Sequence, residues 1–244
     1  MLQNEYWQYS RFITIYLELI PLEQSDIKSD MNKEYINQVS VENFSSIQCS
    51  SYSISYFKRS FDIIFTILVS PIALVIIFFI VLVYPFFGGF SVVFSHKRVG
   101  LNGKDFNLHK IRTYKKNKLS HLSVVDKDEL EIVPVIGNFL RLSRIDELPQ
   151  MLNILKGEMS WIGPRPEQSM FVKDIVKQNP KYQLRHKIRP GITGLAQINN
   201  PDATFKEFEE KLNFDFEYIS KSSLLLDFKI FLVSLRIIFK NFVK

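Results

Sequence analysis

An internal disulfide is excluded by the cysteine content of this 244-residue chain, which has Cys49 alone. A single cysteine cannot form an internal bridge, and a reducing compartment is compatible with it. We also expect no secretory signal, because residues 1–10 lack a basic start and no apolar core with a small-residue cleavage site follows. The chain has four histidines, His96, His109, His121 and His186. They do not cluster at a metal-ligand spacing, so a surface or packing role is expected for each.

Apolar and basic residues are the ones that the chain has in quantity. Hydrophobic residues make up 46% of it and include 22 Phe, so one domain with accessory segments can bury a substantial core. The net charge of +6 favours an anionic partner: nucleic acid, acidic lipid or a phosphorylated substrate. Nucleic acid fits least, because the basic residues flank apolar segments and no nucleic-acid-binding motif is present.

Charge is absent from Ile63 to Phe87, a run of 25 residues. As one straight helix the run would reach about 37 Å, enough to cross a bilayer core of about 30 Å. The pair Ser70-Pro71 lies inside it, and a proline there removes a backbone hydrogen bond and predicts a kink. Both flanks are basic, beginning with Lys58 and Arg59, and basic flanks stay cytoplasmic. Two interpretations remain open: a re-entrant helix that bends at Ser70-Pro71 and returns to the same face, or a single-pass helix with a tolerated proline.

The chain divides into three parts on this pattern. Residues 1–55 are polar and form a leader of unknown role, expected to be poorly ordered or independent. Residues 56–90 hold the membrane helix, and residues 91–244 form a domain on its cytoplasmic side. In that domain, apolar–polar alternation around Gly100 and the turn Asn102-Gly103 predicts a β-hairpin.

Two helices are predicted within residues 201–244. The last one carries a basic stripe formed by Lys229, Arg236, Lys240 and Lys244. Such a stripe on an apolar helix favours the headgroup plane of an anionic membrane over a core helix with one solvated edge. The expected fold is therefore mainly helical α+β: a monotopic membrane protein with a re-entrant helix-break-helix, interfacial amphipathic helices and a small hairpin.

Two adjacent acids, Asp146 and Glu147, precede the apolar run LPQMLNILK, which predicts a short helix that Gly157 ends. One interpretation of the acids is purely local. Asp146 would cap the helix, and Glu147 would be a first-turn acid stabilised by the helix dipole.

The residues around these acids favour a second interpretation. Arg141 lies just upstream, and Arg165 is held between two prolines in the run GPRP. Guanidinium groups bind phosphate in a fork, and Mg²⁺ uses one or two carboxylates plus substrate phosphates. One acid could then attack phosphorus while its neighbour holds the metal. Spacing alone leaves both interpretations open.

The stretch SRIDELPQMLNILKGEMSWIGPRP, residues 143–166, resembles the signature of the bacterial sugar transferases of the small monotopic type, which are polyprenyl-phosphate phosphoglycosyltransferases. Four further segments resemble that family and follow its order. They are KRSFDIIFTILVSPIAL, KRVGLNGKDFNLHKIRT, HKIRPGITGLAQIN and FDFEYISKSSLLLDFKI. The resemblance covers about residues 56–235.

This resemblance implies transfer of a phospho-sugar from a nucleotide-diphosphate sugar, usually a UDP-sugar, to polyprenyl phosphate. The products are UMP and a lipid-linked sugar that starts a surface glycan. It implies Asp146 as the nucleophile, through a covalent aspartyl phospho-sugar, and Glu147 as the residue associated with Mg²⁺. The enzyme would lie on the cytoplasmic face of a bacterial inner membrane, with residues 91–244 as its catalytic domain. The family's helix-breaking pair matches Ser70-Pro71, and its basic pair matches Lys58-Arg59.

Phosphate-binding residues are expected among the basic side chains and the proline hook. The candidates are Lys110, Arg112, Arg141, Pro164 and Arg165. The chain departs from the family pattern at four positions, His96, Tyr114, Asn138 and Asn200. These departures put the identity of the donor sugar in doubt more than the reaction. They also leave a rival hypothesis open, in which the chain is a membrane-anchored, non-catalytic scaffold derived from the family.

Overall fold

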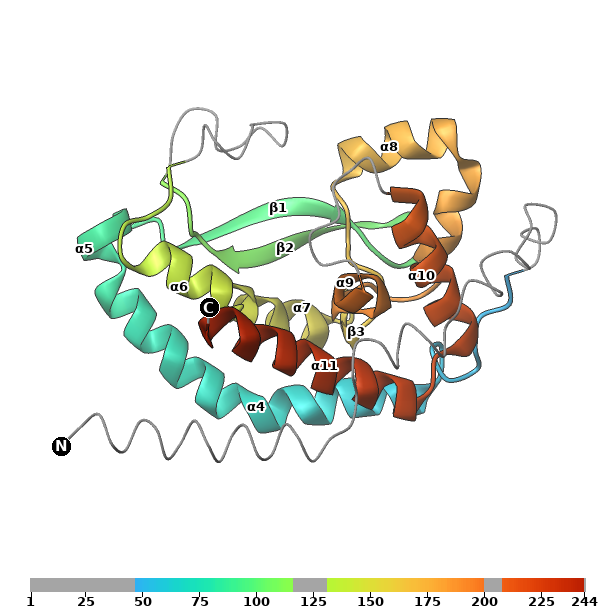
Figure 1. The fold of residues 1–244 in the computed structure, drawn as a ribbon, viewed down its shortest axis with the longest axis horizontal. Helices are drawn as coiled ribbons and strands as arrows, with labels where there is room; N and C mark the ends of the chain where they lie inside the picture. The colour runs from blue at the N-terminus through green and yellow to red at the C-terminus, as the bar shows by residue number, and fades with distance from the viewer. Residues whose placement is uncertain (1–46, 116–130, 200–207, 244) are drawn as a thin grey trace. The chain divides into compact units, whose positions relative to one another are not determined.

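The computed structural model describes residues 47–115, 131–199 and 208–243 (Figure 1). Most of the predicted leader, His121, Asn200 and Lys244 lie outside these residues. The described part has one long apolar helix and two small sheets, and the prediction of a mainly helical α+β fold is confirmed.

The long helix α4, Tyr56–Val83, contains the uncharged run. Its N-cap is Ser55, whose hydroxyl accepts a hydrogen bond from the Lys58 backbone N–H at 3.1 Å. Among the described residues it is the one helix long and apolar enough to cross a membrane. Most of its large apolar side chains are exposed, including Leu68 at 69% and Ile72 at 66%. A surface of this kind needs an apolar environment.

Helix α4 is continuous through Ser70-Pro71, although its ribbon bends in Figure 1. The prediction of two helices with a break between them was therefore wrong. Proline cannot donate a backbone hydrogen bond to the carbonyl four residues earlier, which belongs to Ile67. The Ser70 hydroxyl donates to that carbonyl instead, at 2.8 Å. This replacement satisfies the orphaned carbonyl and lets the helix bend without ending.

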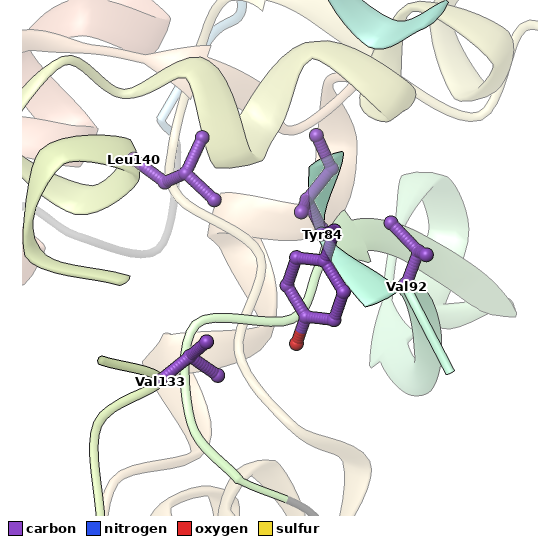
Figure 2. Close-up of a cluster of buried hydrophobic side chains, with 5 residues drawn as sticks. Tyr84, Val92, Val133 and Leu140 are labelled. Atoms are coloured by element: carbon purple, nitrogen blue, oxygen red, sulfur yellow. The ribbon is translucent and has the colours of Figure 1, made fainter. Parts of the chain in front are cut away.

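Both ends of α4 pack against the domain that follows it. Near the N-terminal end, Asp62 and Thr66 are buried, and Asp62 accepts hydrogen bonds from the Ser160 hydroxyl and the Trp161 backbone. Beyond the C-terminal end comes Tyr84, which is fully buried in a core cluster (Figure 2). Its neighbours there are Val92, Ile111, Val133 and Leu140. Both ends of the helix are therefore anchored in this domain.

The predicted hairpin is present and forms one of the two sheets. Strand β1, Val93–Val99, pairs antiparallel with β2, Asp105–Ile111, and Phe94 lies opposite Lys110. Its turn uses Asn102 and Gly103, which both have a positive φ. The second sheet was not predicted. It joins β3, Ser160–Ile162, in parallel to β4, Gly191–Thr193.

Short helices connect these strands. They are α5 (Pro85–Gly88), α6 (Ile136–Leu142), α7 (Met151–Lys156), α8 (Ser169–Gln178) and α9 (Leu195–Asn199), with 3-10 turns at Leu101–Gly103, Ile145–Gln150 and Pro180–Lys187. The prediction of two C-terminal helices is confirmed by α10 (Phe208–Lys221) and α11 (Leu224–Val243). The basic side chains Lys229, Arg236 and Lys240 of α11 are all exposed.

A buried polar cluster joins α4 to the two C-terminal helices. The Lys58 ammonium lies 2.5 Å from Asp227 of α11 and 3.4 Å from Asp62. Asp227 also accepts hydrogen bonds from the hydroxyls of Tyr218, at 2.6 Å, and Tyr52, at 2.9 Å. The aromatic ring of Phe65 on α4 packs against Phe231 of α11 near the same cluster. These contacts fix the start of the apolar helix relative to α11.

Candidate active site

The two acids lie in a 3-10 turn, Ile145–Gln150, that precedes α7. The residue before this turn, Arg144, adopts a left-handed conformation with φ 58°. Helix α7 begins only at Met151, so the prediction that Asp146 caps it was wrong. Gly157 ends the helix in the left-handed conformation, as predicted. The turn leaves both acidic side chains free to point at the hairpin, where β2 lies against it.

Glu147 is held in place by cations. Its Oε1 atom lies 2.8 Å from the Lys110 ammonium, 3.0 Å from the Arg165 guanidinium and 3.5 Å from that of Arg144. Its other oxygen, Oε2, accepts a hydrogen bond from the neutral side chain of Gln150 at 3.2 Å. Glu147 is 4% exposed. Burial favours the neutral form, but the charges of Arg165 and Lys110 outweigh it and hold the Glu147 pKa well below its usual value.

Asp146 stands in a different environment, although it is the adjacent residue. Its Oδ2 atom lies 3.7 Å from the Lys110 ammonium, and its Oδ1 atom is buried with no hydrogen-bond partner in the protein. Burial raises the pKa of Asp146, and the negative charge of Glu147 adds to this effect, while Lys110 opposes it. The dyad thus contains one anchored carboxylate and one with an unpaired oxygen.

The sequence-predicted residues divide into those that meet the dyad and those with other partners. Lys110 of β2 and Arg165, which follows β3, contact the dyad directly. Pro164 is buried and accepts a hydrogen bond through its carbonyl from the Gly191 N–H. It lies next to Arg165 and helps to fix the hook.

Arg112 and Arg141 have contacts elsewhere. The guanidinium of Arg112 donates to the carbonyl of Ser91 at 3.1 Å and lies over the ring of Phe94. That of Arg141 lies over the ring of Tyr114, 4.8 Å from its centroid. These contacts assign both arginines a packing role in this structure, and their role in phosphate binding stays a prediction.

The membrane-related residues also have defined partners. Lys58 is buried in the cluster with Asp227, as described above. Arg59 donates to the carbonyls of Ile154 and Leu155 at the end of α7, at 2.6 and 3.1 Å. A cation at this position stabilises the helix C-terminus. Arg59 therefore links the apolar helix directly to the helix that follows the dyad.

Three residues near the dyad were not among the predicted site residues. Arg144 and Gln150 contact Glu147 from the same turn, and their i±3 spacing could have indicated this. His96 of β1 was assigned a surface or packing role. It lies near the cations of the site. Burial, followed by the charges of Arg98, Lys110 and Arg165, lowers its pKa to about 3. Hairpin register could have found it, since Lys110 lies opposite Phe94 and His96 is two residues along from Phe94 on the same face.

The dyad fits a magnesium ion that also binds substrate phosphates. Among the described residues no group of three His, Cys, Asp or Glu side chains gathers, so the protein alone offers at most two carboxylates. Mg²⁺ commonly takes one or two carboxylates and completes its shell with phosphates and water. Two oxygens here have no cation of their own: Glu147 Oε2, which meets only an amide, and Asp146 Oδ1, which has no partner.

The sequence pattern of a family described as bacterial sugar transferase matches residues 53–241. Among curated proteins, the UDP-N-acetylgalactosamine-undecaprenyl-phosphate N-acetylgalactosaminephosphotransferase of Aeromonas hydrophila is 35% identical over 189 residues, which are 77% of this chain and 45% of that protein. The UDP-glucose:undecaprenyl-phosphate glucose-1-phosphate transferase of Escherichia coli (strain K12) is 35% identical over 76% of this chain and 40% of that protein.

A shorter relative is matched over most of its length. The uncharacterized sugar transferase EpsL of Bacillus subtilis (strain 168) is 37% identical over 179 residues, which are 73% of this chain and 85% of that protein. By contrast, the chain spans less than half the length of the Aeromonas and Escherichia relatives.

Proposed function

Because this chain belongs to the bacterial sugar transferase family, we propose that it is a phosphoglycosyltransferase that moves a sugar-1-phosphate from a UDP-sugar to polyprenyl phosphate. The two longer relatives are named for this reaction with undecaprenyl phosphate as the acceptor. The product would be a polyprenyl-diphosphate-linked sugar that starts the assembly of a surface polysaccharide.

One observation carries the assignment of roles within the dyad: Asp146 has a buried oxygen without a partner, whereas Glu147 Oε1 is taken by Lys110 and Arg165. Both oxygens of Glu147 accept hydrogen bonds from neighbouring side chains, whereas Asp146 keeps one oxygen that no protein group engages. Asp146 is therefore the residue that attacks, and Glu147 is the residue that organises the surrounding cations.

The reaction has two displacement steps at one phosphorus atom. In the first, a carboxylate oxygen of Asp146 forms a bond to the sugar-bearing phosphorus, and the bond from this phosphorus to the oxygen shared with the UMP phosphate breaks. UMP leaves with that electron pair. In the second step, an oxygen of polyprenyl phosphate attacks the same phosphorus, and the bond to Asp146 breaks. The free carboxylate is regenerated, and no proton needs to be moved.

Charge neutralisation is the main contribution of the surrounding residues. Lys110, Arg144 and Arg165 carry three positive charges against the two negative charges of the dyad. This excess favours a diphosphate and opposes its repulsion from Asp146. Glu147 and the donor's phosphate oxygens would hold Mg²⁺, which would neutralise charge that develops on the leaving UMP.

The fold supports a monotopic position at the membrane. Helix α4 starts in the buried Lys58–Asp227 cluster and ends at Tyr84 in the core of the same domain. A helix that crossed a bilayer would place its two ends on opposite sides, but one compact domain cannot lie on both. The exposed apolar side chains of α4 therefore lie in the membrane, and both ends of the helix stay on the same side of it. The acceptor lipid would meet the dyad at the cytoplasmic surface of that membrane.

The proposal is tested by UMP release from UDP-sugars in the presence of polyprenyl phosphate and Mg²⁺. Asp146→Asn should abolish release while the protein still fractionates with membranes. The matched control is Asp174→Asn, which changes an exposed acid on α8 that pairs only with Lys177 among the contacts described. Its activity should equal that of the unmodified protein. Substantial turnover by Asp146→Asn would show that Asp146 is not the nucleophile.

A further inference from the structure

The imidazole of His96 occupies a place in the site that the reaction described above does not use. It belongs to the face of β1 that also carries Phe94 and Arg98. Opposite Phe94 on β2 is Lys110, the cation that bridges Asp146 and Glu147. Diagonal neighbours on one face of an antiparallel pair lie within reach of long side chains. Register therefore brings the His96 ring next to the dyad's own cation.

One ring nitrogen of His96 is buried and makes no hydrogen bond. Its Nε2 atom is shielded from solvent and has no hydrogen-bond partner in the protein. A polar atom in this state costs free energy unless a bound molecule completes its hydrogen bonding. The ring cannot turn freely to find another partner, because it stacks on Phe94 at a centroid distance of 5.3 Å, and Arg112 lies over the Phe94 ring as well.

The chemistry of the missing partner follows from the charges around this nitrogen. Burial keeps the imidazole neutral, and the charges of Arg98, Lys110 and Arg165 add to this effect by opposing its protonation. Two of these cations, Lys110 and Arg165, also contact the dyad, where they would attract the phosphates of the donor. A neutral imidazole brings no positive charge to a diphosphate that already has these cations, whereas a ring nitrogen can exchange a hydrogen bond with an uncharged hydroxyl or amide. In a nucleotide-sugar the uncharged polar groups next to the reacting phosphorus belong to the sugar.

We propose that His96 is a specificity-determining residue, whose Nε2 atom hydrogen-bonds an uncharged hydroxyl or acetamido group of the donor sugar. This inference rests on the proposed function, since it names the part of the UDP-sugar that the site reads. Sites built to bond a substrate hydroxyl reject analogues that lack it, because their own buried polar group is then left unpaired.

The test compares two variants with a control on the other face of the same hairpin. His96→Phe keeps a ring for stacking on Phe94 but removes both nitrogens, and His96→Gln keeps a hydrogen-bonding group at this position. The control is His109→Phe, because His109 points to the opposite face and bonds the Ser95 hydroxyl at 2.8 Å. Each protein is assayed for UMP release from UDP-glucose, UDP-galactose, UDP-N-acetylglucosamine and UDP-N-acetylgalactosamine. Inhibition by UDP, which lacks the sugar, is measured in parallel.

We expect His96→Phe to lower kcat/KM for the preferred UDP-sugar by about tenfold, the usual effect of one lost hydrogen bond. Because the other sugars lose less, the ratio between preferred and disfavoured donors should fall. The inhibition constant of UDP should not change, His96→Gln should alter the order of preference, and His109→Phe should match the unmodified protein.

Three results would overturn the inference: an equal loss with all four UDP-sugars, weaker inhibition by UDP, or unchanged selectivity in both His96 variants. The first two would assign His96 to the diphosphate or to folding. If the unmodified protein releases UMP from none of these donors, it is the proposed function that fails. The two failures are therefore distinguishable.

Discussion

Removal of the Lys110 charge should move the acid limb of the enzyme's pH–rate profile to higher pH. Asp146 must be ionised to attack phosphorus, so the rate falls as pH drops through its pKa. Burial raises that pKa, and Lys110 is the first of the charges that lower it again. In Lys110→Met this opposing charge is gone, and Asp146 should lose its proton only at higher pH than in the unmodified enzyme.

The size of the effect follows from the distance between the charges. The Lys110 ammonium lies 3.7 Å from Asp146 Oδ2, and unit charges about 4 Å apart interact by about 4 kcal/mol at an effective dielectric constant of about 20. Even half of this value changes the ionised fraction of Asp146 more than tenfold on the acid side of the profile. The protein should still fold, because Glu147 keeps its ion pair with Arg165 at 3.0 Å.

The assay is kcat/KM for UMP release measured from acidic to neutral pH, with Lys110→Arg as the control that keeps the charge. The plateau rate of Lys110→Met should also fall, because a phosphate-binding cation is lost, but the position of the limb does not depend on that amplitude. If Lys110→Met, Lys110→Arg and the unmodified enzyme share one limb, the assigned coupling between Lys110 and Asp146 is wrong.

Two further predictions concern the membrane helix. Lys58→Met leaves Asp62 and Asp227 buried without their cation, so the free energy of unfolding should fall by about 3–5 kcal/mol and the Tm by about 6–20 °C. Thermal unfolding in detergent measures this change. A Tm as high as that of Lys173→Met, an exposed control, would contradict the prediction. In a Cys49→Ser background, Tyr56→Cys places a thiol at the first residue of α4 and Phe90→Cys places one beyond its end, at positions that are each 93% exposed. A membrane-impermeant maleimide should label neither in intact cells and both after permeabilisation, whereas labelling of one in intact cells would indicate a spanning helix.

Elements with strong local signals could be predicted from the sequence. The hairpin follows from strand alternation around a turn whose Asn102 and Gly103 tolerate positive φ, and the end of α7 follows from Gly157. The parallel pair of β3 and β4 could not be predicted, because each strand has three residues and the two are joined through α8 and an intervening turn. Strands this short show no periodicity that could identify them.

Conformation at single residues explains the wrong cap assignment. Asp146 precedes an apolar run and has the side chain of a good N-cap, but the left-handed Arg144 starts a 3-10 turn one residue earlier and moves the start of α7 to Met151. A non-glycine residue at positive φ is uncommon, so sequence propensity gave no warning of it. A bend in α4 could be predicted from Pro71, whereas the Ser70 hydroxyl that satisfies the freed carbonyl could not.

The chemistry of the site could be predicted from the sequence, but not all of the residues that form it. Lys110 and Arg165 meet the dyad, since a strand and a proline hook hold them rigidly. Arg112 and Arg141 instead lie over aromatic rings, and no local pattern distinguishes a stacked arginine from one that binds phosphate. The burial of Lys58 depends on Asp227, which is 169 residues away. Contacts over such a separation are set by tertiary packing, and one sequence does not reveal them.

The proposed reaction depends most on the identity of the atom that attacks phosphorus. Protein mixed with a UDP-sugar and Mg²⁺ in the absence of polyprenyl phosphate, quenched in acid and digested, should give a peptide that contains Asp146 and is heavier by one sugar-phosphate group. Adding polyprenyl phosphate before the quench should remove this species, and Asp146→Asn should never form it. If the sugar-phosphate reaches the lipid while no peptide carries it at any time point, transfer is direct and the role assigned to Asp146 is contradicted.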